Sequence, residues 1–170
     1  MHDLIKKAMV YANKAHTGQM YGEVYPYAKH LEDVYNILID FGFSEADNLD
    51  LLVSSWLHDI IEDTCISYSD IKKEFNKDIA EIVYCITDEL GRTRREKKEK
   101  TYPKMRSNPK AIALKVADRI ANVRFSNSQS DSHTNMYKKE FKEFEFNLRL
   151  HNHIDAMWEY LEKLINKSED

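Results

Sequence analysis

The sequence predicts an all-α fold, a compact bundle of many helices, and three observations support that prediction. Apolar residues recur at helical spacing along almost the whole chain. The chain contains only four Gly and three Pro, too few for the closely spaced turns of an all-β sandwich or barrel. No alternating polar and apolar run is long enough to predict a strand.

The first helices are predicted from their apolar stripes. One stripe occupies residues 4–12 and stops near Gly18, and a second occupies residues 34–41, after Pro26 and before Gly42. These two stripes predict the first and second helices of the bundle.

A third helix is expected after Ser44, whose hydroxyl can accept a hydrogen bond from a free first-turn amide. Its apolar face runs from Leu49 to Ile61, and the helix is expected to end in the polar run 58–64. Two shorter helices are predicted next, over residues 69–75 and 77–87.

The second half of the chain alternates polar and helical stretches. Residues 89–108 are polar and basic, which predicts a long functional loop or a frayed helix. Pro109 suits a first helical position, where its missing N–H costs nothing, and an apolar stripe follows over residues 112–123. After the polar patch 126–134, two more helices are expected, over Asn135–Leu150 and His153–Asn166.

Length and cysteine usage bound the class of protein. A chain of 170 residues is long enough for one domain with a real core and too short to suggest two, which predicts a single domain over residues 1–170. Two cysteines and no recognisable secretory signal suggest ordinary thiols in the cytoplasm. No apolar stretch is long enough for a membrane span.

Charge is distributed unevenly. The net charge is -4, yet residues 91–110 contain nine Lys or Arg and two Glu, a local charge of +7 on a body that carries -11. A basic segment of this kind either binds an anion or is a charged face exposed to solvent. Nucleic-acid binding is not expected, because the chain is acidic overall and Tyr102 is the only aromatic residue of the segment.

The polar run 58–63 is the first candidate for chemistry. At about 100° per residue, its polar side chains share one wedge of the expected helix, away from the apolar stripe. His58 stacks over Glu62 and Asp59 over Asp63, because each pair is four residues apart. A solvated polar face would show the same pattern. However, three carboxylates beside one imidazole repel each other unless a cation joins them, which favours a metal.

Two further residues extend the candidate site. His30 lies on the inward stripe of its helix, where it is either a core histidine or a metal ligand. Asp118 lies in mid-helix despite a poor helix propensity and shares a face with Lys115 and Asn122; a structural contact with Arg119 is the alternative. With His58 and Asp59 these residues make a mixed N/O set, suited to manganese, iron, cobalt or zinc.

At these residues the sequence resembles the HD superfamily of metal-dependent phosphohydrolases, whose pattern is H…HD…D. More closely, it resembles the hydrolase domain of the RelA/SpoT homologue family, and most of all its small stand-alone alarmone hydrolases. The resemblance extends from about Ala8 to Val123. Four motifs support it: Ala15-His16-Thr17-Gly18-Gln19, Pro26-Tyr27-x-x-His30, His58-Asp59-x-x-Glu62-Asp63-Thr64 and Lys115-x-Ala117-Asp118-Arg119-x-x-Asn122.

The resemblance implies an all-α HD-domain bundle with one divalent metal ion, usually Mn²⁺. It implies removal of pyrophosphate from the ribose 3′ position of guanosine tetra- or pentaphosphate, so that the partner is a phosphorylated nucleotide. The implied metal ligands are His30, His58, Asp59 and Asp118. Glu62 and Asp63 would position or deprotonate the attacking water, and Asn122 would contact the nucleotide. Carboxylates beside a divalent ion can perform this chemistry.

The chain departs from the family where a basic pair usually follows the Gly-Gln pair, because Tyr21-Gly22 stands there instead. The Tyr21 ring can stack on a base but brings no charge. The basic segment, Lys104 included, could bring positive charge to a polyphosphate, or it could be a solvated helix. Tyr137 could close over the base.

Several alternatives stay open. An HD-domain phosphatase or phosphodiesterase could act on another nucleotide, such as an adenine alarmone, a 3′-phosphorylated dinucleotide or a 5′-nucleotide. A non-catalytic nucleotide-binding domain is a third reading. The terminal helices could also pair two copies of the chain into a homo-oligomer.

Overall fold

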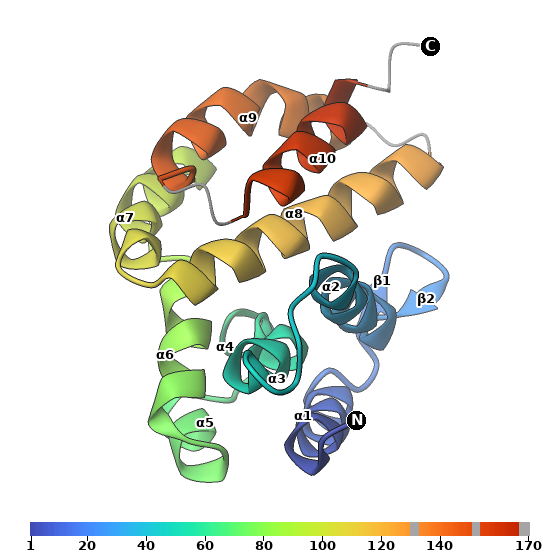
Figure 1. Ribbon diagram of the computed structural model, residues 1–170, viewed down its shortest axis with the longest axis vertical. Coiled ribbons are helices and arrows are strands. Elements are labelled where there is room, and N and C mark those ends of the chain that lie inside the picture. Colours follow the sequence, from blue (N-terminus) through green and yellow to red (C-terminus); the bar gives the residue numbers. More distant parts are fainter. Residues whose placement is uncertain (130–132, 151–153, 167–170) are drawn as a thin grey trace.

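The computed structural model describes residues 1–129, 133–150 and 154–166, and its helices confirm the all-α prediction (Figure 1). In that part of the chain the only strands are β1 (Met20–Tyr21) and β2 (Tyr25–Pro26), which pair as a short antiparallel hairpin that the sequence did not predict. The helices are α1 (Asp3–Ala15), α2 (Ala28–Asp40), α3 (Leu49–Leu57), α4 (Ile60–Asp63), α5 (Tyr68–Glu74), α6 (Lys77–Ile86), α7 (Arg94–Arg106), α8 (Pro109–Gln129), α9 (His133–Leu148) and α10 (Asp155–Asn166).

Helix α8 forms the centre of the bundle. In Figure 1 it crosses the molecule, with α9 and α10 on one side and α2, α3 and α6 on the other. Residues 111–114 and 116–121 are all buried, as expected for a helix enclosed by neighbours rather than amphipathic. This burial places Asp118 and Arg119 inside the molecule.

Helix starts follow the local sequence. Ser67 and Asp70 form a reciprocal capping box at the start of α5. Asn76 accepts a hydrogen bond from the Ile79 amide at 2.8 Å at the start of α6. Pro109 is the first residue of α8, as predicted.

The third predicted helix is interrupted, and its continuity from Leu49 to Ile61 was wrong. Helix α3 ends at Leu57, and α4 begins at Ile60. The Nδ1 atom of His58 lies 2.8 Å from the Ser55 carbonyl oxygen, which in an uninterrupted helix would accept from the Asp59 amide. The side chain therefore competes with the backbone at the point where the helix breaks.

The predicted N-cap of this helix was also wrong. The Ser44 hydroxyl accepts from the Asp47 amide at 3.2 Å, in the turn before the helix. Helix α3 starts later, with Asn48 at the N-cap position.

The basic segment is a helix, α7, so the loop alternative was wrong. It lacks an apolar stripe, and its buried residues are only Thr101, Tyr102 and Met105. Pairs of opposite charge four residues apart, such as Arg95 and Glu99 at 2.9 Å, help to hold it.

The C-terminal helices agree with the prediction in kind and differ at their ends. Helix α8 continues to Gln129, into the predicted polar patch, and α9 begins at His133. His153, the predicted start of the last helix, lies outside the described residues. No described helix has the length and apolar character that crossing a membrane requires.

Candidate metal centre and active site

Three separate elements bring the predicted ligands together. His30 comes from α2, His58 from the break after α3, and Asp118 from α8. The Nε2 atoms of His30 and His58 are 3.1 Å apart, and His30 Nε2 is 3.4 Å from Asp118 Oδ1. One ligand atom from each of these buried residues lies within 4.8 Å of the others, a grouping that could hold a metal ion.

Asp59 completes the cluster. Its Oδ2 atom is 2.9 Å from His58 Nε2 and 3.4 Å from His30 Nε2. The Tyr27 hydroxyl donates to the same oxygen at 2.5 Å. Tyr27 belongs to the Pro-Tyr-x-x-His motif, but nothing in that motif predicts that Tyr27 supports a carboxylate elsewhere in the chain.

Hydrogen bonding fixes the tautomer of His58. A carbonyl oxygen only accepts, so the His58 Nδ1 atom at 2.8 Å from the Ser55 carbonyl carries the proton. In the neutral ring, Nε2 is left with its lone pair facing the cluster. This is how proteins commonly orient a metal-binding imidazole.

Both oxygens of Asp118 have partners. Lys115 Nζ lies 3.0 Å from Oδ2, and Asn122 Nδ2 donates to Oδ1 at 2.6 Å. Burial by itself would raise the pKa of Asp118, but the Lys115 charge and the His30 hydrogen bond outweigh it and hold the pKa well below the ordinary value. The carboxylate is therefore ionised and oriented.

The charges of the cluster favour a bound cation. Burial would lower the pKa of His30, yet Asp118 and Asp59 outweigh it and raise that pKa to about 9. Without a metal, the ring would thus hold a proton between the two carboxylates. Two imidazole nitrogens and the Asp118 carboxylate lie close enough to share one ion, and Asp59 lies beside both imidazoles. This donor set suits a divalent manganese, iron, cobalt or zinc ion equally, so the residues fit the implied metal.

The two acidic residues of α4 lie beside this cluster. Burial raises the pKa of Glu62, which makes it a better proton acceptor. Asp63 accepts from Gln19 Nε2 at 2.8 Å, and Gln19 Oε1 lies 2.7 Å from His16 Nδ1. The motif at residues 15–19 therefore orients Asp63.

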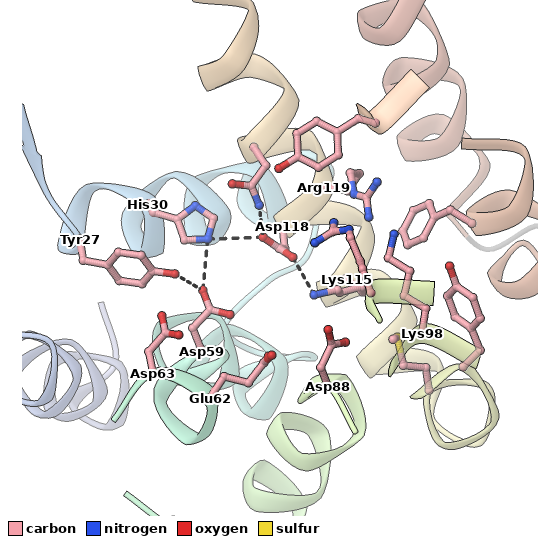
Figure 2. Close-up of a pocket in the computed structure, with 16 residues that line it drawn as sticks. Tyr27, His30, Asp59, Glu62, Asp63, Asp88, Lys98, Lys115, Asp118 and Arg119 are labelled. Carbon is pink, nitrogen blue, oxygen red and sulfur yellow. Dashed lines mark hydrogen bonds and ion pairs between the residues drawn. The ribbon is translucent and has the colours of Figure 1, made fainter. Parts of the chain in front are cut away.

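A pocket of about 230 Å³ opens onto this cluster, and acidic and basic side chains both line it. His30, Asp59, Glu62 and Asp63 lie toward one side, Lys98 and Arg119 lie across from Asp63, and Asp118 lies between the two groups beside Lys115 (Figure 2). Asp88 also lines the pocket. Asp88 was not predicted, because nothing in its local sequence distinguishes it from other helix-end acids.

The basic wall is organised around Glu140. Its carboxylate pairs with Arg94 at 2.7 Å, with Arg119 at 3.2 Å and with Lys98. Three cations thus share one carboxylate, which leaves an excess of positive charge. Burial and the neighbouring arginines lower the pKa of Lys98 to about 8, despite Glu140.

The predicted substrate-binding residues divide into two groups. Asn122 and Tyr137 line the pocket, and the Arg119 guanidinium lies 4.6 Å from the Tyr137 ring centre. Lys104 is not among the lining residues, because its ammonium lies 2.7 Å from Glu89 and over the Tyr84 ring. Tyr21 is also absent from the lining, and from the basic segment the structure supplies Arg94 and Lys98 instead.

Comparison with known proteins gives one family and several relatives. The family model described as "HD domain" matches residues 8–144. The chain is 31% identical over 139 residues to a GTP pyrophosphokinase of Myxococcus xanthus, covering 76% of this chain and 18% of that protein. It is 32% identical over 127 residues to the bifunctional (p)ppGpp synthase/hydrolase SpoT of Escherichia coli, covering 71% and 18%. The chain therefore spans about a fifth of the length of these relatives.

A solved structure, described as a metazoan ortholog of SpoT that hydrolyzes ppGpp, superposes with a TM-score of 0.83. It is 23% identical in sequence, and the match covers 98% of this chain and 96% of that chain. At this identity the likeness shows a common fold.

Proposed function

Because the chain belongs to the HD-domain family, we propose that it is a metal-dependent hydrolase removing pyrophosphate from the ribose 3′ position of guanosine tetra- or pentaphosphate. The proposed ligands of one divalent ion, Mn²⁺, are His30, His58, Asp59 and Asp118. The observation that supports this most is the pairing, in one pocket, of a converging His and Asp cluster with a wall of cations.

Each side of the pocket has a part in the proposed reaction. The divalent ion, when bound, would supply Lewis-acid activation of water and of a phosphate oxygen. Glu62, with its raised pKa, accepts the proton of the attacking water, and Asp63, held by Gln19, positions that water. The bond between phosphorus and the ribose 3′ oxygen then breaks: pyrophosphate leaves with the water oxygen, and the 3′ oxygen takes the proton back from Glu62 and becomes a hydroxyl.

The opposite wall binds the remaining phosphates in this proposal. Arg94, Lys98 and Arg119 outnumber their shared carboxylate, Glu140, so a phosphate brought among them would be paired. Tyr137, held against Arg119, offers a ring face to the base. Asn122 lines the same pocket and donates a hydrogen bond to Asp118.

The partner proposed is a phosphorylated nucleotide rather than a nucleic acid. The proposed setting is the cytoplasm, where Cys65 and Cys85, both unpaired, would stay reduced.

Product analysis tests this function. The protein loaded with Mn²⁺ should convert guanosine tetraphosphate to guanosine diphosphate and pyrophosphate. Asp118→Ala should lower kcat/KM by more than about 100-fold, because even outer partners of metal ligands typically contribute 10–100-fold. Asp40→Ala, at the exposed end of α2, is the matched control and should behave as the unsubstituted protein. Orthophosphate as the product would contradict the proposal.

A second candidate substrate is favoured by the hairpin. Tyr21 and Gly22 stand where the family has a basic pair, and the Tyr21 ring packs on Phe125 at 4.1 Å between ring centres. The hairpin therefore offers no positive charge where the family has a basic pair, which favours a nucleotide other than guanosine tetraphosphate. Turnover of an adenosine analogue, a 3′-phosphorylated dinucleotide or a 5′-nucleotide, with none of the guanosine compound, would establish it. No turnover at all with metal bound would indicate a nucleotide-binding domain.

A further inference from the structure

Tyr21 is placed against the metal centre rather than open to a ligand. Its ring lies 4.8 Å from the His30 ring and 4.1 Å from the Phe125 ring, measured between centres. Its hydroxyl donates to Asn122 Oδ1 at 3.2 Å. A side chain of the β-hairpin thus contacts one proposed ligand directly and a second one through an amide.

The Asn122 amide has its two ends fixed by different partners. Its Nδ2 donates to Asp118 Oδ1 at 2.6 Å, and its Oδ1 accepts from Tyr21. If the amide flipped, its oxygen would face the Asp118 carboxylate, and two acceptors would oppose each other. Burial raises the pKa of Tyr21, so the hydroxyl keeps the proton that it donates.

The hairpin is built to hold Tyr21 in this place. Strand pairing sets Tyr21 opposite Tyr25, and the Tyr27 amide donates to the Gln19 carbonyl at 3.0 Å, which closes the hairpin. Gly22 has φ +64°, and a Cβ atom there would lie 2.6 Å from Phe125 Cζ. Only glycine therefore lets Phe125 approach the turn and pack on Tyr21.

We propose that Tyr21 is a positioning residue of the metal centre, which acts through Asn122 to orient the Asp118 carboxylate. This inference rests on the proposed metal site and deepens it, because it assigns the hairpin to metal binding. Asn122 is then an outer partner of a metal ligand, whose loss typically costs 10–100-fold in affinity. Tyr21, one hydrogen bond further out, should contribute about tenfold, at the lower end of that range.

The test is a double-mutant cycle on Mn²⁺ affinity, measured by competition with a chromophoric chelator on metal-free protein. Tyr21→Phe keeps the ring and removes the hydroxyl, and it should raise the Mn²⁺ Kd about tenfold. Asn122→Ala should raise the Mn²⁺ Kd more than Tyr21→Phe does. In a protein that already carries Asn122→Ala, Tyr21→Phe should change the Kd by less than about twofold, because the amide through which Tyr21 acts is already gone. Tyr25→Phe, on the facing strand with an exposed side chain, is the control and should leave the Kd unchanged.

Two results would overturn the inference. One is a Tyr21→Phe protein that binds Mn²⁺ as tightly as the unsubstituted protein; the other is an equal effect of Tyr21→Phe with and without Asn122. Thermal unfolding of the metal-free proteins shows that each variant is folded. If the unsubstituted protein did not bind Mn²⁺, both the proposed metal site and this inference would be rejected. Tight binding with no hydrolysis would reject only the proposed reaction.

Discussion

At the scale of single residues, Lys98 carries a charge that depends on pH within the working range of most enzymes. Burial, Arg119 and Arg94 disfavour its protonated form and bring its pKa down to about 8, against an ordinary value near 10.4. The ammonium is therefore charged below pH 8 and neutral above it. The basic wall loses one positive charge as the pH rises through this value.

We predict that KM for the phosphorylated substrate rises as the pH increases through about 8, because a neutral Lys98 pairs less well with phosphate. Lys98→Met should raise KM about 10–100-fold at pH 7, the range expected for one hydrogen bond to a charged group, and should remove the pH step. Lys98→Arg retains the charge at all these pH values and should also lack the step, with KM staying low. Steady-state kinetics between pH 6 and 9 measure this, and an unchanged step in Lys98→Met would contradict it.

Sequence reasoning at this scale succeeded where the residue type itself restricts the chemistry. Histidine at an inward helix position and aspartate in mid-helix are unusual enough to be selected, and His30, His58 and Asp118 do converge. It named Lys98 only as one of several cations of the basic segment, gave Tyr27 no role of its own and did not select Glu140. Such residues are common on helix surfaces, and only their contacts with other helices distinguish them.

At the scale of elements, the hairpin depends on its glycine turn. Gly22 has φ +64° and Gly18 has φ +84°, both in the left-handed region that a Cβ atom disfavours. They differ in their surroundings, because a Cβ at Gly22 would meet the Phe125 ring while one at Gly18 would meet nothing within 4 Å.

We predict that Gly22→Ala lowers the free energy of unfolding more than Gly18→Ala does. Both substitutions place a Cβ atom on a left-handed backbone, which costs roughly 1–2 kcal/mol. Gly22→Ala adds about 1–3 kcal/mol, because its Cβ overpacks against Phe125. Urea unfolding of the two variants and the unsubstituted protein measures the difference. Equal losses would show that Phe125 moves away freely.

Element boundaries were the weaker part of the sequence prediction. Periodicity identified helices at α1, α2, α6 and α8 because their buried faces are continuous. It failed at α7, whose highly charged sequence shows no stripe, and at the break before α4, where a side chain takes a backbone acceptor.

At the scale of the whole molecule, the proposed metal centre joins parts of the chain that are far apart in sequence. His30 and Asp118 are 88 positions apart in a chain of 170 residues, and α2 and α8 pack directly on each other. The unfolded chain cannot hold these donors in one place, so a metal that binds the folded protein must stabilise it.

We predict that Mn²⁺ at 100 times its Kd stabilises the protein by about 2.7 kcal/mol, a rise in unfolding midpoint of about 5–10 °C for a chain of this size. Differential scanning calorimetry with Mn²⁺ and with excess chelator measures the shift. Asp118→Ala should lose the shift, whereas Asp40→Ala should keep it. A shift that survives in Asp118→Ala would place the ion elsewhere.

The sequence by itself determined the all-α class, most of the helices and the residues proposed to bind the metal, because periodicity and rare residue types are local properties. Only the tertiary structure decided which charges face the pocket. It turned Lys104 toward Glu89 and brought Lys98, Arg94 and Arg119 around Glu140. It also placed Tyr21 against His30 and Asn122. The physical reason is that these contacts join helices through packing, and helical periodicity specifies which face is buried but not which side chain of another helix it meets.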